Sequence, residues 1–336
     1  MAIPNLPDVS VTIKDGALGS TAGLGTDRCA VVGTCTKGTA NTVYEFTDLQ
    51  TLRDTLGTSV SGGPAVEAAA LILAVSGKPV IVVPTTNATA GSVGTVTLAG
   101  TGPDPGATFT GTPLDGYSIK IKMTLGGSRG TARFRVAFDA DNPAGPTYGD
   151  EIVTAATVST YATDTGLTIA FAVGTYVVGD TYTATCVAPA YTNTNLNTAL
   201  TALAADARAW RFVFAVGEAS AVSGSATMAS SLDTFLTAQA TAHRDAWGLI
   251  QCASDTDANI IAGFSSFSSK RVAVAAGFAS VTSVISGRAF SRGAAWPAAA
   301  RAMAMTLSQD LGEVKSGPLD AVQSLTRDER KTPGLD

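Results

Sequence analysis

Short apolar runs alternate with helix-like patterns between residues 29 and 84. The pattern predicts a buried strand at Ala30–Gly33, a capped helix over Thr47–Arg53 and a strand at Lys78–Pro84 that is bounded by prolines. Pro64 opens a longer helix between them. One face of this helix is expected to be buried: Val66, Ala69, Ala70 and Leu73. Strand, helix, helix and strand make half of an open α/β sheet.

Strict alternation of apolar and polar residues replaces this pattern from about Thr86 to Pro189. In the run Tyr117–Thr124 every second residue is apolar, which predicts a strand with one buried face. A glycine pair then predicts a turn, and Arg133–Phe138 is expected to return as the partner strand. Two further strands are predicted at Leu167–Phe171 and Thr181–Cys186. We therefore expect an inserted all-β domain over residues 86–189, a sandwich or a squashed barrel.

The α/β pattern returns after Asn193 as three helix–strand repeats. The expected helices are Leu196–Asp206, Ala226–His243 and Asp257–Phe264, and the expected strands are Arg211–Val216, Trp247–Cys252 and Arg271–Ala275. Such repeats predict a mostly parallel sheet. The fold class is thus α/β, with an open, mostly parallel sheet in a discontinuous core domain of residues 27–85 and 190–336 that the β domain interrupts.

An extended N-terminal arm is predicted over residues 1–26, which are rich in Pro, Gly and Thr. Its one alternating run places Val9, Val11 and Ile13 on the same face. A lone strand of this kind is stable only at the edge of a sheet. It is either the first strand of its own fold or a strand added to the sheet of a neighbouring subunit.

Composition indicates a neutral surface. Charged residues make up 15% of the chain, against about 25% in typical globular proteins, and Ala, Thr, Gly and Ser take their place. Such a surface suits burial against copies of the same chain, although a secreted Thr-rich β protein would look similar.

The net charge of −5 argues against a nucleic-acid partner. The longest apolar run, Ala65–Val75, contains Glu67 and is too short to span a membrane. The N-terminus lacks the features of a secretory signal, so folding in the cytoplasm is expected.

Candidate chemistry is sparse. Gly33–Thr39 approaches a phosphate-binding loop, but its lysine precedes the second glycine. The acidic cluster around Asp139 and Asp141 lacks the spacing of a calcium loop. His243 has no nucleophile motif to serve. The four cysteines fit neither a zinc nor a disulfide framework and are expected to be buried thiols. We therefore expect no enzyme activity, no cofactor and no metal.

The stretch Gly287–Met303 has the composition of a contact surface. Trp296-Pro297 predicts a helix start with proline at the first helical position, and the turns that follow are almost entirely Ala and Met. Gly317-Pro318 is expected to end this region. Arginines beside large aromatic residues are favoured at protein interfaces. The candidate inter-subunit contacts, together with the arm residues above, are Arg288, Phe290, Arg292, Trp296 and Arg301.

The same stretch, with the Gly-Pro-Leu turn at Gly317–Leu319 and the element Thr332–Asp336, resembles the contractile tail sheath proteins of bacteriophages and related injection machines. The resemblance implies a subunit that polymerises helically around an inner tail tube, displays its β domain outward and shares its N-terminal arm by strand exchange. It also implies tube, baseplate and tail terminator proteins as partners, and location in the virion tail after assembly in the host cytoplasm. Sheath proteins usually continue beyond the last element, so the core domain is expected to be incomplete at its C-terminal side.

The alternative to a sheath subunit is a non-contractile virion or surface protein whose β domain binds glycans.

Overall fold

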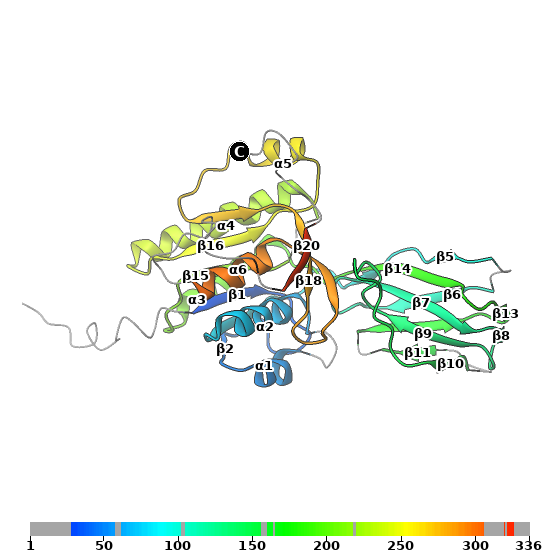
Figure 1. The fold of residues 1–336 in the computed structure, drawn as a ribbon. Coiled ribbons are helices and arrows are strands. Elements are labelled where there is room, and N and C mark those ends of the chain that lie inside the picture. Colours follow the sequence, from blue (N-terminus) through cyan, green and yellow to red (C-terminus); the bar gives the residue numbers. More distant parts are fainter. Residues whose placement is uncertain are drawn as a thin grey trace, which may run out of the picture.

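The fold is described by a computed structural model for residues 28–57, 62–101, 105–155, 160–163, 165–217, 220–305, 319 and 321–325. The predicted arm, with Val9, Val11 and Ile13, lies outside the described residues, as do the Gly317-Pro318 break and the element Thr332–Asp336. The described chain is elongated: an α/β core lies at one end and a group of antiparallel strands at the other (Figure 1).

The core is built on a six-stranded sheet. Its strands in spatial order are β17 (Val272–Ala275), β16 (Trp247–Gln251), β15 (Phe212–Ala215), β1 (Cys29–Gly33), β3 (Val80–Pro84) and β2 (Tyr44–Phe46). All neighbours are parallel except β2, which runs antiparallel to β3. The predicted mostly parallel sheet fits this arrangement, and β2 is an edge strand that the hydrophobic pattern did not predict.

Helices cover both faces of this sheet. One face packs against α3 (Asn193–Ala205) and α4 (Val222–Thr241), and the other packs against α1 (Leu49–Leu56), α2 (Pro64–Ser76) and α6 (Ala295–Ala304). The short helix α5 (Asp257–Phe264) packs against α4. Two caps agree with ordinary helix chemistry: Asp48 accepts from the backbone N–H of Thr51 at 2.8 Å, and Thr192 caps α3.

Helix α2 corrects a prediction. The expected single buried face is wrong, because every residue from Pro64 to Leu73 is buried. The helix lies between the sheet and α6, and α1 covers part of it as well. A helix that is apolar around its whole circumference is typical of such a position. Glu67 is therefore buried in the first turn of α2.

The antiparallel strands form two sheets over one hydrophobic core. The larger sheet has the order β10 (Ile152–Val153), β9 (Arg133–Ala137), β7 (Tyr117–Leu125), β14 (Thr181–Val187) and β4 (Ser92–Val93), with β5 (Thr97–Ala99) also paired to β14. The smaller sheet has the order β11 (Thr160–Ala162), β12 (Leu167–Phe171) and β6 (Ala107–Gly111). The short strands β8 (Gly127–Ser128) and β13 (Thr175–Tyr176) pair with each other.

The alternation predicted for Tyr117–Thr124 is confirmed, with Tyr117, Ile119, Ile121 and Met123 buried. The predicted return strand is β9, which pairs antiparallel with β7. Two sheets around a shared core are the arrangement of a sandwich.

A further antiparallel sheet lies between the core and the inserted strands (Figure 1). Its order is β19 (Ala289–Gly293), β18 (Phe278–Thr282) and β20 (Val322–Leu325). The sequence pattern did not predict this sheet. Strand β19 leads directly into α6, which begins at Ala295 and not at Pro297. Proline is tolerated at this third helical position because the amides of the first turn have no partner within the helix.

Candidate functional site

Two chain segments connect the α/β core with the inserted β domain, and they pair with each other. The backbone N–H groups of Ala88 and Thr89 donate to Ala190 O at 2.8 and 3.1 Å, and Ala190 N donates back to Thr89 O at 3.0 Å. Thr85 N also donates to Gly33 O at 2.8 Å, at the end of strand β1. We call these paired segments, residues 85–91 and 188–192, the neck.

The neck leaves the core at the carboxyl edge of the parallel sheet, beside the point where the order of the strands reverses between β1 and β15. Open α/β folds commonly bind ligands at this place. Here, Thr34 donates to Pro189 O at 3.5 Å, and the ring of Tyr191 lies against Gly217, where a methyl group would come within 2.9 Å of it. The neck thus occupies the usual ligand position of the fold.

Strand β19 and Arg288, the residue just before it, make a further connection to the inserted domain through three side chains at alternate positions. The guanidinium of Arg288 lies 5.2 Å from the ring centre of Phe138. Phe290 belongs to the hydrophobic core of the β domain. Arg292 reaches Asp115, in the loop between β6 and β7. We call Arg288, Phe290 and Arg292 the clasp, because one face of β19 holds the inserted domain against the core.

Arg292 is the most fully bonded member of the clasp. Its two terminal nitrogens donate to the two oxygens of Asp115 at 2.9 and 2.6 Å, and one of them also donates to Gly116 O at 3.0 Å. The guanidinium lies 5.1 Å from the ring centre of Phe290 and 4.9 Å from that of Trp296. Asp115 is 1% exposed and Arg292 8% exposed. A two-fold hydrogen-bonded pair of this kind combines charge with a fixed geometry.

A second carboxyl group lies beneath the clasp. Glu67 Oε2 accepts from Ser283 Oγ at 2.8 Å, in the turn between β18 and β19. Its other oxygen, Oε1, has no hydrogen-bond partner within the described residues. Burial raises the pKa of Glu67 to about 7, and nearby Asp115 adds to the rise, while Arg292, the Ser283 hydrogen bond and Arg53 lower it.

Helix α6 is fixed at both ends by buried polar side chains. Gln251 accepts from Ala295 N at 3.0 Å and donates to the carbonyls of Cys252 and Gly277, each at 3.0 Å. At the other end, Arg211 donates to Ala302 O and, at 3.4 Å, to Met305 O. These bonds hold the ring of Trp296 under Arg292. They could not be foreseen from the local sequence pattern.

The residues predicted as inter-subunit contacts therefore have defined places within one chain. Phe290, Arg292 and Trp296 are buried together at the junction of core and inserted domain, and Arg288, just before β19, lies over the ring of Phe138. Arg301 is half-buried in the last turn of α6. Their described contacts lie within the chain, and their role between subunits stays a prediction. Sequence reasoning missed Asp115, Glu67 and Ser283, which carry no recognisable motif.

His243 and the four cysteines do not belong to the clasp. His243 is not on the helix as expected: α4 ends at Thr241, and His243 follows as an exposed residue with a φ of 59°. Cys29, Cys186 and Cys252 are buried and Cys35 is half-buried, and all four are free thiols. Burial raises the pKa of Cys35 to about 12 and that of Cys186 to about 11, so both thiols stay protonated at neutral pH.

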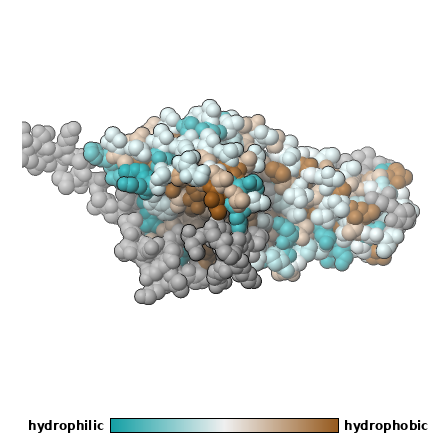
Figure 2. All heavy atoms as spheres, turned by 90° about the horizontal axis from the view of Figure 1, so that it is seen from above, coloured by the Kyte–Doolittle hydropathy of each residue, from teal (hydrophilic) through white to brown (hydrophobic). Residues whose placement is uncertain are grey.

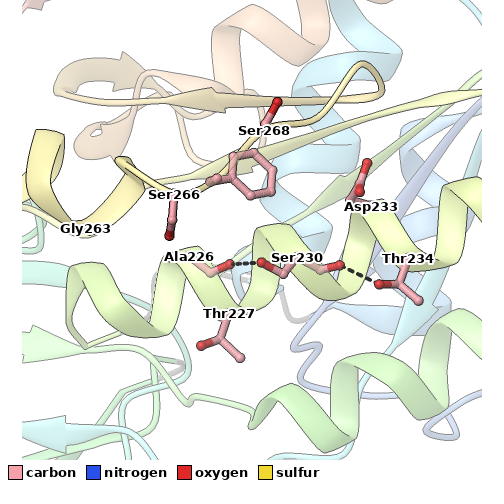
Figure 3. Close-up of a pocket in the computed structure, with 9 residues that line it drawn as sticks. Ala226, Thr227, Ser230, Asp233, Thr234, Gly263, Ser266 and Ser268 are labelled. Atoms are coloured by element: carbon pink, nitrogen blue, oxygen red, sulfur yellow. Dashed lines mark hydrogen bonds between the residues drawn. The ribbon is translucent and has the colours of Figure 1, made fainter.

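A groove of about 360 Å³ lies on the core between α4 on one side and the end of α5 with the segment after it on the other (Figure 3). Its lining is mainly small and hydroxylated: Ala226, Thr227, Ser230, Asp233, Thr234, Gly263, Ser266, Phe267 and Ser268. Ser230 and Thr234 donate to backbone carbonyls one turn earlier, at 2.9 Å each. Asp233 accepts a hydrogen bond from Ser269. Ser230, Thr234 and Asp233 are thus already paired inside the chain.

The face that contains this groove carries little charge. Helix α3 has no charged residue, and Asp233 is the only one in α4. Exposed hydroxyls on both helices bond to their own backbone, as Thr198, Thr201 and Thr227 do. Viewed from above, most of the surface has intermediate hydropathy (Figure 2). Burying such hydroxyls under another protein surface costs little free energy, because their hydrogen bonds are already made within the helix.

Two kinds of feature are absent from the described residues. No group of three or more His, Cys, Asp or Glu residues is placed to hold a metal ion. None of the helices found in these ranges has a stretch suited to the hydrocarbon layer of a membrane.

Comparisons with known proteins place these features in a family. No curated protein matches the chain. Among solved structures, the chain is similar to a sheath tail protein from Listeria innocua, with 13% sequence identity and a TM-score of 0.40, over 89% of this chain. The chain spans 60% of the length of that protein. A family model described as DUF2586, N-terminal domain, matches residues 6–334, and the chain therefore belongs to this family.

Proposed function

We propose that this chain is a structural subunit of a contractile tail sheath. The observation that carries the proposal is the resemblance of residues 287–336 to sheath proteins. In this proposal the α/β core polymerises helically with copies of itself around an inner tube, and the inserted β domain faces outward. A contact between two different surfaces of one subunit, repeated without closure, produces such a helix.

The surface chemistry supports an assembling protein better than a catalyst. Helices α3 and α4 present a nearly uncharged face whose hydroxyls are satisfied within the chain. The carboxyl edge of the parallel sheet, the usual ligand position, is filled by the neck. We accordingly propose that the chain is not an enzyme and uses no cofactor.

The connection between the two domains supports rigid-body motion. Each domain has its own hydrophobic core, and the neck and clasp join them through a small number of buried contacts. A subunit of this kind can rotate within a lattice while it keeps its internal structure. Contraction would then release free energy as neutral surfaces become more fully buried. The proposed partners are other copies of the chain, an inner tube protein and the proteins that end the tail, and the proposed location is the virion tail.

Negative-stain electron microscopy of the complete protein tests this function. We expect long tubes or stacked rings at high protein concentration. A strictly monomeric complete protein under the same conditions would count against a sheath, and binding to a glycan array by such a monomer would favour the alternative surface protein. A variant that lacks residues 1–20 tests the arm separately: it should form no tubes if the arm exchanges strands, and should form them unchanged if the arm folds within its own subunit.

A further inference from the structure

The carboxyl group of Glu67 lies in an unusual setting at the junction of the two domains. It is 5% exposed, and one of its two oxygens has no hydrogen-bond partner within the described residues. A buried ionised carboxylate is normally paired or fully hydrogen-bonded, because removing its charge from water is costly. In the part of the chain that the structure describes, Glu67 accepts one hydrogen bond, from Ser283, and so lacks the full set of partners that an ionised carboxylate needs.

This carboxyl group is linked to the clasp through the turn between β18 and β19. Ser283 Oγ donates to Glu67 and accepts from the backbone N–H groups of Ile285 and Ser286, at 3.1 Å each. Ser283 N donates to Arg288 O at 2.8 Å. The turn that carries the clasp is thus bonded to α2 through one side chain. An ionised Glu67 therefore places its negative charge directly against this turn.

Asp115 and Arg292 are the charged groups of the domain junction that act on Glu67. A cavity of about 10 Å³ is lined by α2 residues Glu67 and Leu71, by the hairpin turn, and by Phe290, Arg292 and Trp296. Asp115 opposes ionisation of Glu67, while Arg292 and, from α1, Arg53 favour it. Helix α6, which packs along α2, carries Arg301 as its one charged residue. Arg292 is hydrogen-bonded to Asp115 and is also attracted by Asp141, and an ionised Glu67 adds a further negative charge that attracts it.

We propose that Glu67 is a proton-operated latch for the inserted β domain. With a proton on Glu67, Arg292 stays with Asp115 and the clasp holds the β domain against the core. When Glu67 gives up its proton to water, its negative charge draws Arg292 away from Asp115, and the cavity, which has room for about one water molecule, hydrates the carboxylate. The clasp then loosens. This device depends on the residues of the junction alone and does not require the proposed sheath function.

Hydrogen–deuterium exchange of the complete protein between pH 6 and pH 8 tests the latch. The pKa of Glu67, raised by burial to about 7, implies an ionised fraction of about one tenth at pH 6 and about nine tenths at pH 8. After correction for the intrinsic pH dependence of exchange, amides of Gly116–Ile119 and of β19 should exchange up to about ninefold faster at pH 8. The Glu67→Gln variant should show no such change, because its side chain stays neutral.

The matched control is Glu151→Gln, the same substitution at an exposed carboxylate of the β domain that pairs with Arg133. It should keep the pH response of the unmodified protein. The proposal is overturned if the junction of the unmodified protein exchanges equally at both pH values, or if Glu67→Gln responds like the control. Should Glu67→Gln fail to fold, carbon NMR of the glutamate carboxyl groups in the unmodified protein decides. One group titrating near pH 7 supports the latch, and titration of every glutamate below pH 5.5 refutes it.

Discussion

Arg292 and Asp115 are 177 positions apart in the chain, yet they form a buried ion pair with two hydrogen bonds, at 2.9 and 2.6 Å. Asp115 belongs to the inserted β domain and Arg292 to the strand that precedes α6. Besides the two paired segments of the neck, this pair is a principal polar link between the two domains. Its energetic role can be tested directly.

Removing one partner of this pair should destabilise the protein strongly. Arg292→Ala leaves Asp115 buried without its cation, and such a loss typically costs about 3–5 kcal/mol. Arg292→Lys should cost less than alanine but remain clearly destabilising, because lysine keeps the charge and cannot make the two-fold pair. Urea unfolding followed by circular dichroism measures both.

The matched control is Arg133→Ala, which breaks the more exposed pair with Glu151 at 3.0 Å. Such pairs contribute about 0–1 kcal/mol. If Arg292→Ala proves as mild as Arg133→Ala, the ion pair does not hold the two domains together.

The stability of the protein should fall as the pH rises toward 7. Burial, with a contribution from Asp115, raises the pKa of Glu67 from its ordinary value of 4.5 to about 7. The folded state therefore holds the proton more tightly than the unfolded chain. The contribution of the protonated Glu67 side chain to the free energy of unfolding is complete below pH 4.5, and it is lost as the pH rises through 7. At about 1.4 kcal/mol for each pH unit between the two values, the contribution is about 3 kcal/mol.

Urea midpoints measured from pH 5 to pH 8 check this expectation. The difference between the unmodified protein and Glu67→Gln isolates the glutamate, since all other groups are shared. Glu67→Gln should gain stability relative to the unmodified protein as the pH increases. A constant difference between the two across this range would show that Glu67 titrates at its ordinary pKa.

The local sequence pattern predicted elements whose signals lie within a few residues. The alternation of Tyr117–Thr124 is one example, and the proline-bounded strand predicted at Lys78–Pro84 and found at Val80–Pro84 is another. It failed for α2, because an apolar helix has no preferred face that tells which neighbours will cover it. It also left Asp115 unnoticed, since no local spacing indicates which buried arginine a loop carboxylate will meet. The residues of β19 stood out by composition, but their surroundings depend on pairings between distant parts of the chain.

Gly293 is expected to be intolerant of any side chain. A methyl group at this position would lie 2.3 Å from the Gln251 side chain, which caps α6 through Ala295 N. Gly293→Ala should displace Gln251 and leave buried polar groups unpaired, at a cost of about 1–3 kcal/mol. The control is Gly149→Ala, where the nearest atom would be 3.6 Å away, and a change within about 0.5 kcal/mol is expected. Equal thermal midpoints for the two variants would mean that Gln251 moves aside without loss.

The four cysteines should be nearly inert in the native protein. Cys29, Cys186 and Cys252 are each 3% exposed or less, and burial raises the pKa of the half-buried Cys35 to about 12. Because the thiolate is the reactive form, all four should react slowly with an aromatic disulfide reagent at pH 8 and quickly after unfolding in guanidinium. The slow rate of thiol reaction in the native protein should be set by the rate at which the structure opens. The Cys35→Ser variant should therefore show almost the same rate. Rapid reaction of one thiol in the native protein, lost in Cys35→Ser, would show that the segment after β1 opens far more readily than its burial implies.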